Sequence, residues 1–176
     1  MKFNSIALKA IYLHEMDRFR RTLAQSLLSP VLSTSLYFIV FGSVIGGYVQ
    51  KIDGISYGSY IVPGLLMLTL LTQSISNTSF GIFFPKFNGT IYEILAAPIS
   101  TLEIVLAFVG AGATKTLIVG VMIFITATFF VEVEVKYPVL MIFLLVLVSF
   151  TFALFGFLIG LMSSNFEQMS IIPSLV

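Results

Sequence analysis

The feature of this sequence that most constrains its fold is a set of four long stretches with almost no charge. Residues 22–50, 54–85 and 137–166 carry no charged side chain, and residues 104–130 carry only Lys115. A helix needs roughly 20 mostly apolar residues to cross a bilayer, and in lipid it satisfies its own backbone hydrogen bonds. The pattern therefore predicts an all-α, polytopic membrane protein. Its four full spans are expected at residues 27–48, 60–83, 108–130 and 138–161.

The composition indicates the same class and excludes several others. Charged residues make up only 10% of the chain, whereas a soluble domain carries about 25%. The absence of cysteine excludes disulfides and thiolate metal sites. With a net charge of +1, the chain offers no extended basic surface for nucleic acid. We therefore expect a lipid bilayer, and no nucleic acid, among its partners.

The end of the sequence predicts part of a fifth span. After Glu167 the chain becomes apolar again and then stops at Val176. As a helix, residues 169–176 would rise about 12 Å, too little for a hydrocarbon core of about 30 Å. We expect a chain that is incomplete at its C-terminus, as a fragment or a truncated reading frame. A tail that folds at the membrane interface is the alternative.

Lysine and arginine in the short loops predict the orientation, because cytoplasmic loops are richer in these residues. The segment before the first span and the loop after the second hold more of them than the other two loops. The cations of the first group are Lys2, Lys9, Arg18, Arg20, Arg21 and Lys86, and those of the second are Lys51 and Lys136. The N-terminus is therefore predicted to be cytoplasmic.

Residues 6–23 predict an amphipathic helix that lies in the membrane interface. Apolar side chains recur on one helical face at spacings of three and four residues. They are Leu8, Tyr12, Met16, Phe19 and Leu23. Charged residues around this stripe, such as Lys9 and Arg20, suit the anionic head groups of lipids. The alternative is an ordinary positively charged anchor before the first span.

The loop at residues 85–103 predicts a short helix held between the second and third spans. Residues 88–89 form an Asn-Gly turn signal, and Thr90 with Glu93 has the spacing of a capping box. Pro98 is expected to end the helix. Its apolar face would consist of Ile91, Ile94 and Leu95. The side chains left free to contact a partner are those of Tyr92 and Glu93, unless the segment is only a connector.

A polar stripe follows the second half of the second predicted span. It consists of Thr69, Gln73, Ser76 and Asn77, at helical spacings. Two interpretations remain open. The side chains join helices by hydrogen bonds, each contributing about 1 kcal/mol or less, or they line a path for a substrate.

Lys115 is the charged residue inside the third predicted span. A lysine at mid-bilayer costs on the order of several kcal/mol unless it is paired or its stem carries the ammonium to the head groups. Counting back from Phe130 places Lys115 about one and a half turns inside the cytoplasmic boundary. That depth favours snorkelling. Pairing with another residue, or a role toward substrate, is the alternative.

Close helix contacts are predicted at two GxxxG pairs, because glycine lets helix backbones approach one another. The pairs are Gly42 with Gly46 and Gly156 with Gly160. Gly54 and Gly58 have the same spacing but are expected to lie in a loop.

The sequence shows no catalytic or metal-binding constellation, so we expect neither an enzyme nor a metal site. Residues 110–116 superficially resemble a phosphate-binding P-loop. That motif requires a glycine directly before its lysine, and Thr114 stands there instead. We therefore expect no ATP site on this chain.

Residues 88–103, Asn-Gly-Thr-Ile-Tyr-Glu-Ile-Leu-Ala-Ala-Pro-Ile-Ser-Thr-Leu-Glu, resemble the cytoplasmic signature of ABC-2-type exporter permeases. In that family a Gly-Thr, an acidic residue, a leucine and a Pro-Ile/Leu-Ser recur after the second span. The amphipathic segment at residues 6–23 is similar to the family's elbow helix. Residues 163–168, Ser-Ser-Asn-Phe-Glu-Gln, resemble its second cytoplasmic turn.

By this resemblance, residues 1–176 form a single ABC-2-type transmembrane domain, the permease of an ATP-driven exporter in the cell (inner) membrane. Residues 85–103 would be a coupling-helix loop that docks on a separate ATPase subunit. The resemblance assigns this contact to Gly89, Thr90, Tyr92, Glu93, Leu95 and Pro98. ATP would bind the partner subunit, with no cofactor on this chain. Two permease chains, identical or related, would form the substrate path.

Two other functions remain as alternatives to an ATP-driven exporter. An ATP-independent secondary transporter or channel would need ionisable residues that face an internal path, and the predicted spans offer Lys115. A nonfunctional truncated permease is the second alternative, because the family has six spans.

Overall fold

The computed structural model describes residues 4–45, 51–52, 55–133 and 135–169. Side chains are described for these residues except 42–45 and 51–52. The predicted contact between Gly42 and Gly46 therefore lies outside the described residues. So does most of the expected partial fifth span.

The described chain is almost entirely helical. Helix α1 (Ser5–Arg21) leads into α2 (Leu23–Tyr37), which continues as a π-helix, η1 (Phe38–Ile45). Two short antiparallel strands, β1 (Lys51–Ile52) and β2 (Ile55–Ser56), then pair Lys51 with Ser56. The remaining helices are α3 (Tyr57–Asn88), α4 (Ile91–Ala96), α5 (Thr101–Phe130) and α6 (Pro138–Met162). The strand pair was not foreseen from the sequence.

Four helical segments in the described part of the chain are long and apolar enough to cross a membrane. They are Leu23–Phe41, Tyr57–Asn88, Thr101–Phe130 and Pro138–Met162. This confirms the predicted all-α, polytopic class. Helices α3 and α5 extend past the predicted spans, with 32 and 30 residues. A helix of that length rises about 45–48 Å, so both helices must tilt or project beyond a hydrocarbon core of about 30 Å.

Local chemistry explains where these helices begin and end. The Ser56 side chain accepts a hydrogen bond from the Ser59 backbone N–H, 3.3 Å away, and so caps the start of α3. Gly89 ends α3 with φ of 79°, a left-handed conformation that favours glycine. Pro138 occupies the first turn of α6, where its missing N–H has no cost.

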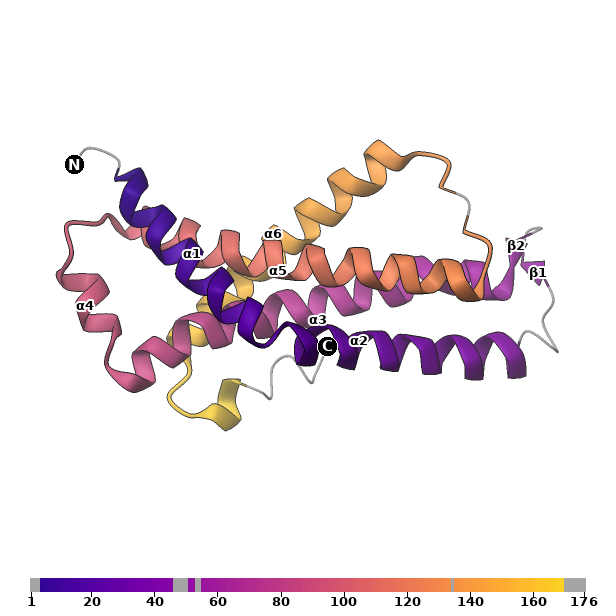
Figure 1. Ribbon diagram of the computed structural model, residues 1–176, viewed down its shortest axis with the longest axis horizontal. Helices are drawn as coiled ribbons and strands as arrows, with labels where there is room; N and C mark the ends of the chain where they lie inside the picture. Colours follow the sequence, from indigo (N-terminus) through magenta and orange to yellow (C-terminus); the bar gives the residue numbers. More distant parts are fainter. Residues whose placement is uncertain (1–3, 46–50, 53–54, 134, 170–176) are drawn as a thin grey trace.

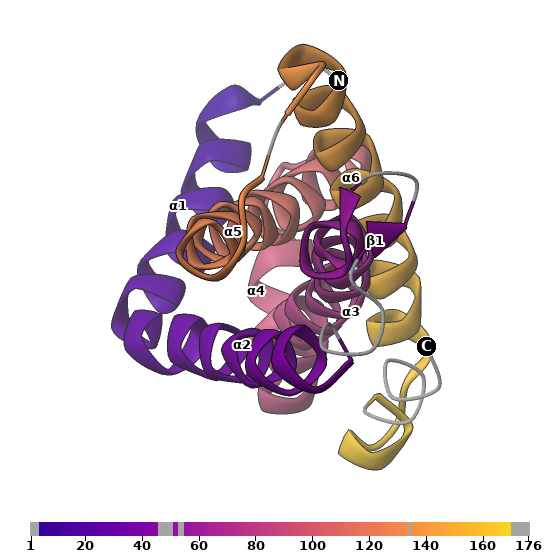
Figure 2. The same cartoon turned by 90° about the vertical axis from the view of Figure 1, so that its right-hand side faces the viewer.

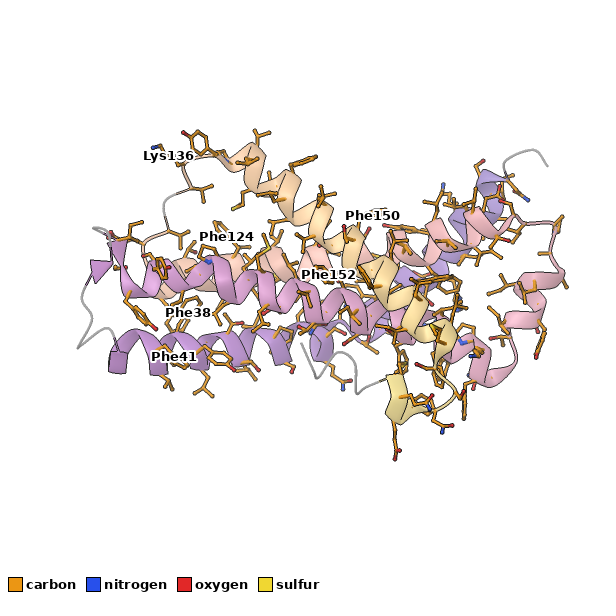
Figure 3. The ribbon with its side chains drawn as sticks, turned by 180° about the vertical axis from the view of Figure 1, so that it is seen from behind. Phe38, Phe41, Phe124, Lys136, Phe150 and Phe152 are labelled. Carbon is orange, nitrogen blue, oxygen red and sulfur yellow. The ribbon has the colours of Figure 1, made fainter. Side chains whose placement is uncertain are left out.

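The two ends of the bundle carry different elements. Figure 1 shows α1 and α4 toward one end, and β1 and β2 at the opposite end. Lys136, just before α6, lies at the strand end, as Figure 3 shows from behind. Viewed along the bundle, α3 and α5 occupy the middle, with α1 and α6 on opposite sides (Figure 2). Helix α5 is the most enclosed of the four long apolar helices. Within its most apolar stretch of 18 residues, 61% is buried, against 22% for the same length of α6.

Glycines allow α6 to pack closely on α3. A Cβ atom on Gly156 would lie 2.5 Å from the carbonyl oxygen of Ile75, and one on Gly160 would lie 2.5 Å from that of Ser79. The hydroxyl of Ser79 donates a hydrogen bond to the Gly156 carbonyl across the same interface, at 2.9 Å. The structure thus places the second predicted GxxxG pair at a helix contact. Gly58, expected in a loop, instead lies buried in the first turn of α3 against Val131.

Lys86 joins α3 to the C-terminal end of α6 at the edge of this helix contact. Lys86 of α3 donates hydrogen bonds to the carbonyls of Leu161 and Ser163, at 2.7 and 2.9 Å. These carbonyls lie at the C-terminal end of α6, where a helix has unpaired acceptors and a partial negative charge. The ends of α3 and α6 are therefore held together by a charge-assisted contact.

We expect Gly160→Ala to destabilise the protein by about 1–3 kcal/mol, because the added methyl would overlap the Ser79 backbone as well as the Ile82 side chain. Gly64→Ala is the matched control, since a Cβ atom there meets nothing within 4 Å. Thermal unfolding in detergent, followed by far-ultraviolet circular dichroism, measures both variants. Equal melting temperatures for the two variants would contradict the proposed close contact between α3 and α6.

Candidate functional site

The connection between α3 and α5 contains α4, the helix expected from the loop motif. It is only six residues long and begins at Ile91, two residues after the left-handed Gly89. The predicted capping box at Thr90 and Glu93 is wrong. Thr90 is itself in a helical conformation and makes no side-chain cap bond. Its hydroxyl reaches back to the Pro85 carbonyl instead, at 3.4 Å, because the sharp turn at Gly89 brings it beside the end of α3.

The three apolar residues that the sequence predicted on one face of α4 lie on two different faces. Ile91 and Ile94 pack against the buried cluster around Ile104 and Phe108. Leu95 points away and is 62% exposed, together with Tyr92 at 73%. Glu93 and Pro98 are exposed as well. We call the exposed side chains of Tyr92, Glu93 and Leu95 the α4 surface. The opposite face of the same helix packs against the buried cluster.

A capping box does exist nearby, at the start of α5. The Ser100 side chain accepts from the Glu103 N–H at 3.4 Å, and the Glu103 carboxylate accepts from the Ser100 N–H at 2.7 Å. The second oxygen of this buried carboxylate accepts a hydrogen bond from the backbone N–H of Asn4. Glu103 thus joins the start of α5 to the start of α1. The Ser-x-x-Glu pattern was readable in the sequence, but the contact with Asn4 was not.

Lys115 does not snorkel, so the favoured sequence interpretation is wrong. Its side chain is 4% exposed, and its ammonium lies 2.7 Å from a carboxylate oxygen of Glu15. Arg18 approaches the same oxygen at 2.8 Å, and its guanidinium lies over the ring of Phe80. Helix α1 packs on α5 and covers Lys115, so the lysine side chain does not extend to the head-group region of the membrane. No sequence signal indicated Glu15, because the partners lie a hundred residues apart.

Helix α1 therefore packs on protein along one face. Phe19 and Glu15 are its buried residues, and the Tyr12 hydroxyl donates to that of Thr114 on α5, at 3.1 Å. The predicted apolar stripe contains Tyr12 and Phe19 but omits Glu15, which lies on the same face. Leu23, the last residue of the predicted stripe, begins α2 and is exposed.

Part of the polar stripe lines a groove of about 190 Å³ between α2 and α3. Thr69 and Gln73 are among the residues of α3 that form its wall. The Asn77 amide donates to Gln73 at 3.4 Å, and Ser76 is exposed. The lining residues are Ser29, Pro30, Ser33, Thr34, Tyr37, Leu65, Leu68, Thr69, Thr72 and Gln73. The groove is rich in hydroxyl groups and has no charged residue in its wall.

The P-loop-like residues 110–116 lie within continuous helix α5. The Thr114 and Thr116 hydroxyls donate to carbonyls one turn earlier, Gly110 and Gly112. A phosphate cradle needs backbone N–H groups that are free to point at a ligand, and a helix interior offers none. Nor does the described part of the chain contain a group of three or more His, Asp or Glu residues placed to hold a metal.

Comparison with known protein families identifies the family of this helical membrane protein. Residues 6–176 match the family described as ABC-2 type transporter. The chain belongs to the ABC-2 type transporter family. As a membrane component of such a transporter, it is not itself an ATPase, and membership of the ABC-2 type family implies a separate ATPase subunit as a partner.

Curated relatives of this ABC-2 type chain agree. Inner membrane transport permease YadH of Escherichia coli strain K12 is 37% identical over 171 residues. The alignment covers 97% of this chain and 67% of that protein. The proteins of the same name from Escherichia coli O157:H7 and Shigella flexneri match to the same extent. No solved structure matches the chain.

We expect Glu103→Ala to lower stability by about 1–3 kcal/mol, because it leaves two backbone donors without their acceptor. Glu93→Ala is the matched control on the exposed face of α4, and should change stability by less than about 0.5 kcal/mol. Chemical unfolding of the two variants in detergent provides the comparison. If Glu93→Ala proved the more damaging change, the assignment of Glu93 to a free surface would be incorrect.

Proposed function

We propose that this chain is the inner-membrane permease subunit of an ATP-driven exporter, and that α4 is the helix on which a separate ATPase subunit docks. The observation that carries the proposal is the α4 surface. Tyr92 and Leu95 are large, apolar and exposed at an end of the bundle, beside the single charge of Glu93. Ile91 and Ile94 anchor the opposite face.

The way in which α4 is held at both ends suits a helix that transmits force. A free loop would deform under load, whereas this helix is bounded by the turn at Gly89 and by the Ser100–Glu103 capping box. Exposed aromatic and aliphatic side chains are the usual anchors of a protein interface. The site residues Gly89, Thr90 and Pro98 would then shape the turns on either side of the α4 surface.

The orientation that we propose places the N-terminus in the cytoplasm. Most of the described cations lie in α1, which precedes the first span, or in the last turn of α3, among them Arg20, Arg21 and Lys86, whereas Lys136 lies at the strand end of the bundle. This asymmetry supports the cytoplasmic assignment. With this orientation, the α4 surface would face the compartment that supplies ATP to the partner subunit. That subunit would hold the nucleotide, with no cofactor on this chain.

The substrate path is proposed along the groove that includes Thr69 and Gln73, with Ser76 and Asn77 continuing the stripe on α3. Two permease chains, identical or related, would face one another across it. The hydroxyl-rich wall supports a path more than a lipid contact, because uncovered polar side chains are unfavourable in hydrocarbon. A secondary transporter is less well supported, since Lys115 is engaged with Glu15 and does not face a path.

Site-specific cross-linking tests the docking proposal. We would introduce Glu93→Cys in this cysteine-free chain and treat native membranes with a thiol-reactive cross-linker. An ATP-sensitive adduct with a nucleotide-binding subunit is expected. Tyr137→Cys, exposed just before α6, is the matched control and should give no such adduct. An inserted protein that forms no adduct from Glu93 or Tyr92 would overturn the docking role of α4.

Thiol accessibility tests the proposed path. A cysteine at Gln73 should react with a water-soluble maleimide, because water must enter a polar path and thiolates form in water. A cysteine at Leu32, an exposed side chain on α2, should react much more slowly, since it faces lipid. Equal labelling of the two positions would argue against an aqueous path at this groove.

A further inference from the structure

Helices α1 and α5 are joined by polar contacts along most of the length of α1. The Glu103 carboxylate binds the Asn4 N–H at one end. The Tyr12 and Thr114 hydroxyls meet at 3.1 Å, and Glu15 meets Lys115 at 2.7 Å. Contacts of this kind fix both the distance and the register of two helices, whereas apolar packing alone would allow them to slide.

The Glu15–Lys115 pair lies where three helices meet. Its carboxylate faces Gly81 of α3 so closely that a Cβ atom there would be 3.3 Å from the Glu15 oxygen. Arg18 adds its ion pair to Glu15 and its contact with the Phe80 ring of α3. The junction therefore joins α1 and α5 directly and brings α3 against them.

The charges at this junction depend on one another. Glu15 and Lys115 have side chains only 3% and 4% exposed, and Arg18 is 27% exposed. One carboxylate thus serves two cations. Removing Glu15 would leave the buried Lys115 without a counter-charge, which is strongly unfavourable. Removing Lys115 would leave Glu15 paired only with Arg18 of its own helix.

The α4 surface is connected to the same unit. Only residues 97–100 separate α4 from α5. Ile94 of α4 and Ile11 of α1 both pack against the cluster that contains Ile104 and Phe108 of α5. Displacement of α4 therefore acts on α1 and α5 together, provided that the polar junction holds the two helices in register.

We propose that Glu15 and Lys115 are positioning residues: their ion pair makes α1, α4 and α5 move as one lever, which carries ATP-driven movement of the docked ATPase to α3 and its groove. This inference rests on the function proposed above. Neither residue belongs to the α4 surface or lines the groove between α2 and α3, so the pair would act through the geometry of the helices.

The first test measures the junction without the ATPase. Cysteines replace Tyr12 and Thr114, and a short bis-maleimide joins them in membranes. We expect Glu15→Gln or Lys115→Met to reduce the cross-linked fraction about tenfold. Glu15→Gln leaves the buried Lys115 without its carboxylate, and Lys115→Met leaves Glu15 paired with Arg18 of its own helix alone, so that no charge joins α1 to α5 at this point. The double variant Glu15→Lys with Lys115→Glu keeps one anion and two cations and should restore cross-linking. Asp17→Asn, on the exposed face of α1, is the control and should change nothing.

The second test measures transmission. A cysteine at Gln73 reports maleimide labelling with and without ATP, in membranes that also contain the ATPase, and Glu93→Cys reports docking in parallel. Glu15→Gln should retain the Glu93 adduct but lose the ATP-dependent change at Gln73, and the charge-swapped double variant should regain it. A merely structural role would not produce this rescue by exchanged charges.

The outcomes separate the two proposals. Absence of an adduct from both Glu93 and Tyr92 in the otherwise unaltered chain would overturn the docking function, while the first test still decides whether the pair holds α1 on α5. Unchanged cross-linking in Glu15→Gln and Lys115→Met would overturn the positioning role. Normal docking with a fully retained ATP response in Glu15→Gln would overturn the lever.

Discussion

The close contact of α3 with α5 and α6 is the interaction on which the rest of the structure depends. Inside a bilayer, helices gain little from hiding apolar surface, because lipid is as apolar as leucine. They associate when small residues let their backbones approach and when polar groups pair across the contact. Gly156 and Gly160 meet α3 in this way, and Ser79 adds a hydrogen bond. With α3 held centrally, the outer helices α2 and α6 can expose long apolar faces to lipid.

The charged groups of α1 follow a different principle. A helix at the membrane interface needs only apolar and basic faces to stay there, but α1 also commits Glu15 to a buried position beside Lys115. Such a pair adds little net stability compared with apolar residues of the same shape. Its consequence is specificity, because the charges are satisfied in one register of α1 on α5. The same reasoning explains Glu103, whose carboxylate serves the starts of two helices at once.

The docking role proposed for α4 depends on this packed scaffold. Tyr92 and Leu95 are exposed only because Ile91 and Ile94 occupy the inner face of a helix too short to be stable alone. The groove on α3 likewise exists because α2 stands beside Thr69 and Gln73 with serines facing it. The α4 surface and the groove are thus products of how the helices are placed.

The sequence by itself determined the class and the presence, in the described residues, of four helices long and apolar enough to cross a membrane. A stretch of twenty or more residues without charge is typical of a helix that lies in lipid. The sequence also determined the position of α4, through the Asn-Gly turn and its short apolar pattern. Only the tertiary structure decided which side of α4 is free, which capping box forms and what becomes of Lys115. Leu95 and Ile94 are equally apolar in the sequence, and Glu15 looks like an ordinary interfacial charge. Their roles depend on contacts between residues as far as a hundred positions apart, and local pattern carries no information about such contacts.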